Sequence, residues 1–294
     1  MLEKRLELYI TFKCNNNCLF CIEKENRLRY KNKQIFKDDQ DIFAQLSKYR
    51  KNGYSHLNLL GGEPFLDKNI TKILTIAKKL NFKIALATNG SLLANEKIAA
   101  ETLPLIDDLI ISIHGHNNDL VTKLSQNKQL YQNLLSGLAN TRKYFKGRLL
   151  KVNCVINKFN YKYLLEILKF IKLHGVNEVN LTSLDITDYN KDLAINFVKL
   201  KPLIKQLVEF SKSQDMILRF SDIPLCILGD YFYLSNHLFF DQRDKYYLEG
   251  DKEENVERNK IKPKICKKCS KQEICQGLDF KYHKILGDKA LKPF

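Results

Sequence analysis

The sequence lacks any run of about 18 apolar residues, the length that predicts a membrane-spanning helix. Tryptophan is absent, and only two methionines occur among the 294 residues. Met1–Arg5 also lacks the apolar stretch of a secretion signal, so we expect a cytoplasmic protein. Thiols stay reduced in the cytoplasm, and the eight cysteines therefore indicate metal ligands more than disulfides.

Acidic residues are scarce relative to basic ones. The chain has 33 Asp and Glu residues and 49 Lys and Arg residues, which gives a net charge of +16. This balance favours a polyanionic partner such as RNA, or an acidic peptide. A lysine-rich composition explains the same excess, and the excess is dispersed over the chain, so charge alone supports a nucleic-acid partner only weakly. Length and a hydrophobic fraction of 44% fit one large domain, or one domain with a smaller second one.

Three cysteines, Cys14, Cys18 and Cys21, lie within eight residues directly after a strand-like run. Thiols at this density are metal ligands or disulfide partners. A cubane iron–sulfur cluster has four irons, and each commonly takes one Cys thiolate. Three local thiols leave one iron without a protein ligand, and an open coordination position makes a metal site catalytic rather than structural.

Strand patterns alternate with helix patterns through the first two thirds of the chain, which indicates parallel strands joined by right-handed crossovers. The expected strands are 6–11, 56–60, 83–87, 109–113, 149–156 and 178–184. The expected helices are 39–50, 69–80, 91–102, 130–144 and 161–174. Six units are too few for an eightfold barrel, so we predict an α/β fold with a partial, TIM-like (β/α)6 barrel.

Polar residues follow these strands at the ends where α/β folds place ligand contacts. Gly61, Gly62 and Glu63 follow the second strand, and two glycines let a ligand approach the backbone closely. Asn89 lies in the turn after the third strand, and Ser112 ends the fourth. His114 and His116 follow Ser112, and each is either a loop imidazole or an active-site residue.

Cys-x3-Cys-x2-Cys with Phe20 before its last cysteine resembles the motif of the radical S-adenosylmethionine (radical SAM) superfamily, and Gly61-Gly62-Glu63 resembles the segment that binds the amino group of SAM. The resemblance implies that Cys14, Cys18 and Cys21 hold a 4Fe–4S cluster whose open iron binds SAM. Reductive cleavage would then yield a 5′-deoxyadenosyl radical that takes hydrogen from a substrate, with flavodoxin or ferredoxin as electron donor.

The same resemblance implies roles for other residues. Phe20 would pack near the adenine of SAM, while Asn89 and Ser112 would contact SAM or substrate. Neighbouring residues of a strand face opposite sides, so Asn153 and Cys154 point apart. A polar residue of this strand contacts the ribose or carboxylate of SAM in the family, which makes Asn153 the candidate. Cys154 would face the helices as a small buried residue.

Four more cysteines, Cys226, Cys266, Cys269 and Cys275, lie near the end of the chain. Four thiolates fully ligate either Zn²⁺ or a 4Fe–4S cluster. Their spacing resembles the SPASM and Twitch tails of radical SAM maturases, which favours a second 4Fe–4S cluster over zinc. We therefore expect a barrel core (1–190), a connecting helix and strand (191–220) and a small, irregular, Cys-rich metal-binding domain (221–294), with a charged loop over 241–264.

The substrate is harder to predict than the cofactors. The leading hypothesis is a maturase that acts on a peptide or protein. The alternatives are a small-molecule dehydrogenase and an RNA-modifying enzyme. A protein of another class, a non-catalytic metal-bound RNA-binding protein, is disfavoured because a structural site has no use for the open iron that three thiols leave.

Overall fold

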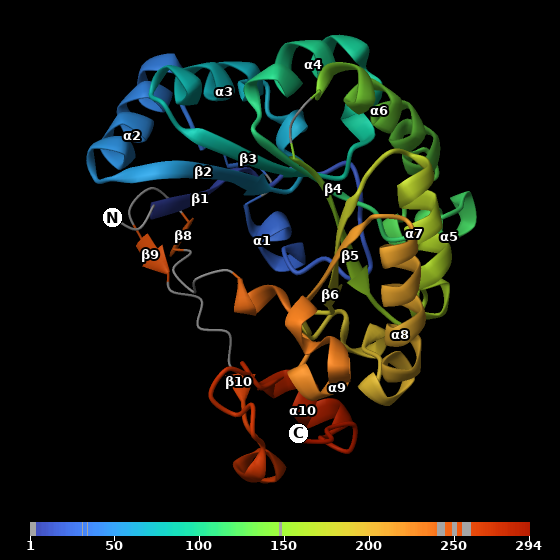
Figure 1. Cartoon of the computed structure of the whole chain (residues 1–294). Coiled ribbons are helices and arrows are strands. Elements are labelled where there is room, and N and C mark those ends of the chain that lie inside the picture. The colour runs from blue at the N-terminus through green and yellow to red at the C-terminus, as the bar shows by residue number, and fades with distance from the viewer. Residues whose placement is uncertain are drawn as a thin grey trace.

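The computed structural model describes residues 4–30, 32–33, 35–146, 149–239, 245–248, 252–254 and 260–294. A curved sheet with the strand order β7-β6-β5-β4-β3-β2-β1-β8-β9 runs through the molecule. Figure 1 shows the larger helices along its outer, convex side and the C-terminal part of the chain below its β6 end. No helix within the described residues is long and apolar enough to cross a bilayer.

All neighbouring strands from β1 to β7 pair in parallel. The strands of the sheet are β1 (Lys4–Thr11), β2 (Tyr54–Gly61), β3 (Lys83–Thr88), β4 (Asp108–Ser112), β5 (Leu149–Ile156), β6 (Glu178–Ser183), β7 (Ile217–Ser221), β8 (Lys245–Leu248) and β9 (Lys252–Glu254). The first six confirm the predicted alternation and the partial barrel.

Three strands extend the sheet beyond that prediction. β7 lies in the stretch expected to connect two domains, yet it pairs in parallel with β6. β8 pairs in parallel with β1, and β9 returns antiparallel to β8. The expectation of a loop throughout 241–264 was therefore wrong, because short segments there complete the hydrogen bonding of the β1 edge.

Six helices cover the convex face: α2 (Asp39–Lys51), α3 (Ile70–Lys79), α4 (Glu96–Thr102), α6 (Leu130–Tyr144), α7 (Leu164–Leu173) and α8 (Phe197–Ser213). The other α-helices of the described residues are α1 (Lys24–Arg29), α5 (Asn118–Ser125), α9 (Leu225–Leu228) and α10 (Phe280–Leu286). Short 3-10 turns are η1 (Pro64–Leu66), η2 (Ser91–Ala94), η3 (Leu103–Leu105), η4 (Tyr161–Tyr163), η5 (Lys191–Leu193), η6 (Gly229–Leu234), η7 (Asn236–Leu238) and η8 (Lys264–Lys268).

The predicted helix over 91–102 is divided in two. Ser91–Ala94 is a 3-10 turn, and α4 starts only at Glu96. Asn95 separates them because its extended backbone and its side chain, which accepts hydrogen bonds from Lys97 N and Ile98 N, cap α4. A side chain that satisfies helix N–H groups begins a new helix at that point.

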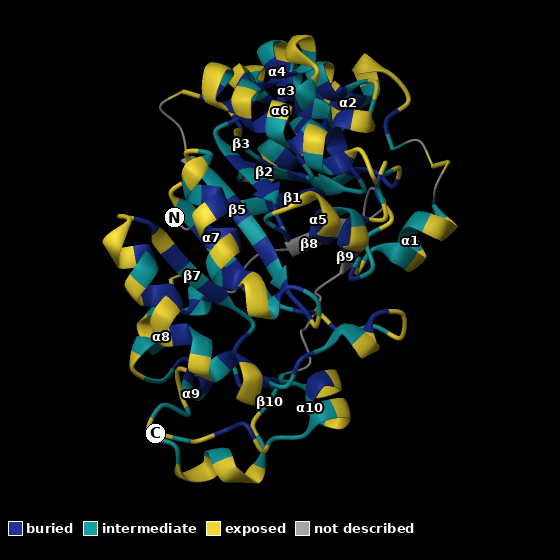
Figure 2. Cartoon of the chain, turned by 90° about the vertical axis from the view of Figure 1, so that its right-hand side faces the viewer, coloured by how far each residue is buried: buried dark blue, intermediate teal, exposed yellow. Residues whose placement is uncertain are grey.

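The strands separate an apolar outer face from a partly open inner one. In β3, Ile84 and Leu86 are at most 1% exposed, whereas the alternate residues Ala85 and Ala87 are half-buried. Each fully buried Leu or Ile stabilises the fold by about 1.5–3 kcal/mol, so the packing of strands against helices carries the core. Figure 2 shows this buried layer between sheet and helices. The concave face is left available for a site.

The C-terminal residues form a small unit of their own. β10 (Lys260–Ile261) and β11 (Leu278–Asp279) pair antiparallel, and α10 follows. Tyr282 of α10 stacks on Phe197 of α8 with ring centroids 4.3 Å apart, and its hydroxyl accepts a hydrogen bond from Phe197 N at 2.7 Å. This contact fastens the C-terminal unit to the helical layer of the sheet.

Candidate active site

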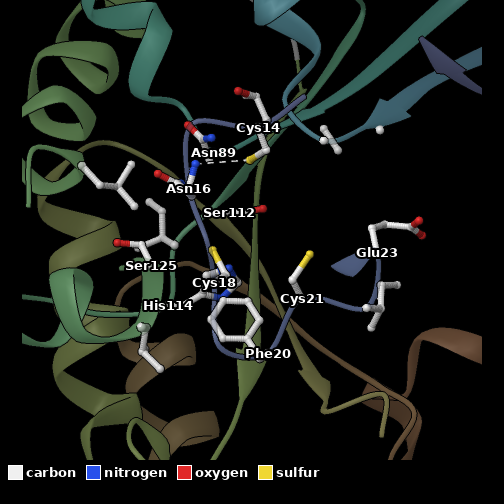
Figure 3. A pocket seen from close by; sticks show the side chains of 18 of the residues that line it. Cys14, Asn16, Cys18, Phe20, Cys21, Glu23, Asn89, Ser112, His114 and Ser125 are labelled. Carbon is white, nitrogen blue, oxygen red and sulfur yellow. Dashed lines mark hydrogen bonds between the residues drawn. The ribbon is translucent and has the colours of Figure 1, made fainter. Parts of the chain in front are cut away.

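A cavity of about 430 Å³ opens at the carboxyl ends of β1 to β4. Its volume is within the range of about 300–1,000 Å³ found for ligand sites. It brings together most residues singled out from the sequence, many of which Figure 3 labels: Cys14, Cys18, Phe20, Cys21, Gly61, Gly62, Asn89, Ser112 and His114. Glu63, Asn153 and His116 do not line it.

Three asparagines between the first two cysteines anchor the loop that carries the thiols. Asn15 donates from Nδ2 to Ser91 Oγ at 2.8 Å. Asn16 Oδ1 accepts from Asn127 Nδ2 at 2.8 Å, and Asn17 N donates to Ser125 O at 2.9 Å. These partners lie far along the chain, so α5, the turn before α6, and η2 hold the loop in place. In the sequence, the only indication of this role is that all three residues between Cys14 and Cys18 are polar.

The loop after Cys21 also contains α1, in a stretch between the expected strand 6–11 and the expected helix 39–50 where neither was predicted. Arg27 of this helix donates from Nη2 to Asn16 O at 2.7 Å and from Nη1 to Cys21 Sγ at 3.8 Å. Sequence reasoning missed this contact, because six residues of mixed polarity carry no helical pattern and Arg27 was one of several basic residues there.

Gly61 and Gly62 lie directly against the cysteine loop. Gly62 N donates to Thr11 O at 2.8 Å. A Cβ on Gly62 would lie 2.1 Å from Lys13 O, and one on Gly61 would lie equally close to Thr11 O. Gly61 also has a φ of +135°, which side chains rarely tolerate. The two glycines are therefore required for the close approach of two backbones beside the thiols.

The carboxylate of Glu63 faces the protein interior rather than the cavity, and its side chain is 0% exposed. It accepts hydrogen bonds from Thr88 Oγ1 at 2.7 Å and from Asn89 N at 2.8 Å. Burial raises the pKa of Glu63 to about 7, against the opposite effect of these hydrogen bonds. In this arrangement Glu63 fastens the turn after β3 to the turn after β2, and its predicted contact with SAM stays a prediction.

His114 and Phe20 form one wall of the cavity, with ring centroids 4.4 Å apart in an edge-on arrangement. Burial lowers the pKa of His114 to about 3, so the ring is neutral. Val155 N donates to its Nδ1 at 3.0 Å, which leaves the ring proton on Nε2. His114 therefore fixes the position of Phe20. His116 points elsewhere, with its ring 5.5 Å from that of Tyr163.

Asn153 belongs to a row of polar side chains across the next strands. Its Oδ1 accepts from Asn180 Nδ2 at 2.9 Å, and Asn180 Oδ1 accepts from Ser221 Oγ at 2.8 Å. Ser112 is its register partner on β4. A contact of Asn153 with SAM stays a prediction. Cys154 is 0% exposed on the opposite face, where the alternation of the strand predicted it.

The three cavity thiols form a donor set that fits three irons of one cluster. Burial raises the pKa of Cys18 to about 12 and also raises that of Cys14. Cys14 and Cys21 are close enough for their charges to raise the pKa of Cys18 further. Iron binding requires thiolates, so the metal has to displace these protons. The remaining cavity leaves room beside the thiols for a second ligand.

The family model described as the Radical SAM superfamily matches residues 8–171, which is more than half of the chain. The chain belongs to the radical SAM superfamily. Membership implies a 4Fe–4S cluster and SAM as cofactors, and it makes the chain a radical SAM enzyme. The match ends before β6, so it covers the cysteine loop and the first five strands.

Two curated relatives of this radical SAM enzyme are GTP 3′,8-cyclases. The chain is 31% identical over 187 residues to a probable GTP 3′,8-cyclase of Saccharolobus solfataricus, covering 61% of this chain and 56% of that protein. It is 26% identical over 274 residues to the GTP 3′,8-cyclase of Lactiplantibacillus plantarum, covering 92% of this chain and 75% of that one. The chain thus spans little more than half of the archaeal relative.

Solved structures show the same fold. The structure of Streptococcus suis SuiB bound to precursor peptide SuiA aligns with a TM-score of 0.61 at 19% identity. The alignment covers 81% of this chain and 53% of SuiB. At that identity the likeness establishes the fold alone.

The four C-terminal cysteines gather at a second place in this radical SAM enzyme. Cys226 of α9, Cys266 of η8, Cys269 and Cys275 line one cavity of only about 20 Å³. Burial raises the pKa of Cys226 and of Cys266, and each also feels the charges of the neighbouring cysteines. The structure thus brings the predicted group of four thiols to one cavity.

Proposed function

We propose that Cys14, Cys18 and Cys21 hold the SAM-binding cluster and that the substrate is a small molecule of the nucleotide class. The observation that carries the substrate class is the relative named GTP 3′,8-cyclase, which aligns with 92% of this chain. A peptide or protein substrate, our first expectation, has weaker support, because the likeness to peptide-bound SuiB speaks for the fold only.

When bound, the cluster and SAM supply the 5′-deoxyadenosyl radical. The residues of the chain position these bound groups and shield them from water. Gly61 and Gly62 bring backbone polar groups to the cavity, while Phe20, held by His114, offers an apolar surface for the adenine. Ser112 offers a hydroxyl from the end of β4. The apolar outer face keeps these groups rigid.

Room for a substrate lies beside this cavity. A cleft of about 760 Å³ runs between the segment after β6 (183–188) and α10, and Ile22 lines both it and the first cavity. Its wall carries charges of both signs: Asp188 and Lys191 lie on the side of the segment after β6, and Lys284 lies on α10. A polar small molecule bound there would lie next to the thiol-bearing loop.

We further propose that the four C-terminal thiols hold a second 4Fe–4S cluster rather than zinc. The four thiols line one cavity, and their spacing in the sequence resembles that of the SPASM and Twitch tails. In a 4Fe–4S cluster each of the four thiolates would bind a different iron. Anaerobic loading should then give about eight irons per chain and no zinc.

The substrate test uses anaerobically loaded protein with SAM and dithionite in place of flavodoxin or ferredoxin. Each of the four ribonucleoside triphosphates, deuterated on the ribose, is compared with a panel of short acidic peptides. We expect one nucleotide to increase 5′-deoxyadenosine formation and to transfer deuterium into it, and Cys14→Ala to show neither effect. Stimulation and label transfer by a peptide, with none by any nucleotide, would reject the nucleotide class and support a maturase.

A further inference from the structure

Arg27 is placed to act on the cluster itself. It comes from α1, which begins three residues after Cys21 and lies on the concave side of the sheet in Figure 1. One amino group, Nη1, is 3.8 Å from Cys21 Sγ, and the other, Nη2, donates to Asn16 O at 2.7 Å. The guanidinium therefore connects the backbone between the first two cysteines with the sulfur of the third.

The positive charge of Arg27 has no carboxylate partner among the residues that the structure describes. The nearby Glu23 accepts hydrogen bonds from Tyr9 Oη at 2.9 Å and from Asn26 Nδ2 at 2.9 Å instead. Arg27 is half-buried on the wall of the cavity that Cys14, Cys18 and Cys21 also line. Its field is thus directed at all three cluster ligands, and partial burial reduces the screening by water.

Reduction adds one electron to the cluster and makes it more negative by one charge, with no bond formed or broken. A nearby cation, and an N–H group that donates to a ligand sulfur, stabilise the more negative state and so raise the reduction potential. The electron comes from a low-potential one-electron donor of the flavodoxin or ferredoxin kind.

We infer that Arg27 is a positioning residue that raises the reduction potential of the SAM-binding cluster through its contact with Cys21. This role rests on the cluster held by Cys14, Cys18 and Cys21, and it is independent of the substrate. Arg27 thereby decides how readily the cluster accepts the electron that the reaction requires.

The test is a redox titration followed by electron paramagnetic resonance, in the absence of SAM and substrate, with spectra scaled to iron content. Arg27→Gln removes the charge at nearly the same length. We expect about a tenfold lower ratio of reduced to oxidised cluster at a given potential, which equals about 59 mV for a one-electron couple. Arg27→Lys keeps the charge but not the planar guanidinium, and its reduction potential should lie between those of the unaltered protein and Arg27→Gln.

Arg29→Gln is the matched control, because it removes the same charge from the same helix. Arg29 is exposed, and its guanidinium carbon lies 5.9 Å from the centre of the Tyr30 ring. Its potential should equal that of the unaltered protein. Equal potentials for Arg27→Gln and Arg29→Gln would overturn the inference, as would an unchanged potential combined with weaker SAM binding, which would make Arg27 a ligand contact. If neither Arg27 variant holds iron, Arg27 serves loop assembly and the redox role is rejected.

Discussion

The two groups of cysteines differ in number, in what holds them and in the space beside them. Cys14, Cys18 and Cys21 lie in one loop, next to a cavity of about 430 Å³. Cys266, Cys269 and Cys275 lie within ten residues of each other, and Cys226 of α9 joins them around a cavity of about 20 Å³. The first group supplies three donors, one fewer than the irons of a cubane, beside a cavity large enough for a ligand, whereas the second group supplies four donors, one for each iron. Sites built from the same side chain are thus suited to catalysis in one case and to electron transfer or structural support in the other.

Both regions depend on a glycine at a close backbone approach. Gly62 lies against Lys13 O in the first region, and Gly277 lies against Ile261 O in the second, where a Cβ would be 2.3 Å away. Gly277 N also donates to Cys275 Sγ at 3.4 Å. In each case the backbone itself is brought next to the cysteine-bearing segment, which a side chain would prevent.

The largest expected effect comes from removing one thiol of each group. Cys14→Ala should reduce 5′-deoxyadenosine formation with SAM and dithionite to the level without protein, because the SAM-binding cluster loses one of its three ligands. Cys269→Ala should keep this cleavage while losing about four irons per chain. Anaerobic iron analysis and product chromatography measure both. If Cys269→Ala lost SAM cleavage while its first cluster kept its iron, the separate roles of the two cysteine groups would be contradicted.

A buried carboxyl makes the first region sensitive to pH. Folding raises the pKa of Glu63 from its ordinary 4.5 to about 7, so the folded chain holds a proton that the unfolded chain releases. The resulting stability is complete below pH 4.5 and is lost as pH rises through about 7. The loss should be about 3 kcal/mol over that window. Thermal unfolding at matched iron content checks this as a difference between two proteins. The stability of the unaltered chain relative to Glu63→Gln should fall over that window, because contributions that both proteins share, such as that of His114, cancel.

The paired glycines offer a sharper comparison. Gly62→Ala and Gly277→Ala should each destabilise the chain by about 1–3 kcal/mol, because the new Cβ displaces a backbone carbonyl. Gly62→Ala should also weaken SAM binding, since its neighbour is the cysteine loop, whereas Gly277→Ala should leave SAM binding unchanged. Unfolding curves and SAM titrations separate the two effects. Equal SAM affinity in both variants would contradict the placement of Gly62 at the SAM site.

The smallest expected effect concerns the contact between the regions. Tyr282→Phe removes the hydroxyl that accepts a hydrogen bond from Phe197 N and keeps the ring stack. The net loss should be about 1 kcal/mol, together with faster hydrogen exchange at Phe197 N. SAM cleavage should stay unchanged. A large loss of SAM cleavage would mean that this contact positions the first site as well.

Local patterns were enough to predict the barrel strands and the two cysteine groups. Alternation of apolar residues within five or six positions identifies a strand, and the spacing of Cys14, Cys18 and Cys21 lies within eight residues. The pairing at the sheet edges escaped such reasoning: a strand was expected within 191–220 but not its place beside β6, and β8 lies in an expected loop. β7 and β8 are short, and they exist because the exposed edges of β6 and β1 offer unpaired backbone groups to them.

The sequence by itself determined the residue types at the site: three thiols that leave an iron open, and two glycines that permit close approach. Only the tertiary structure decided their orientation. It turned the carboxylate of Glu63 inward to Thr88 and Asn89, and it brought Arg27 to Cys21. The chemical character of a side chain can be recognised from the sequence alone. The direction in which the side chain points depends on hydrogen-bond partners that the fold brings from distant parts of the chain.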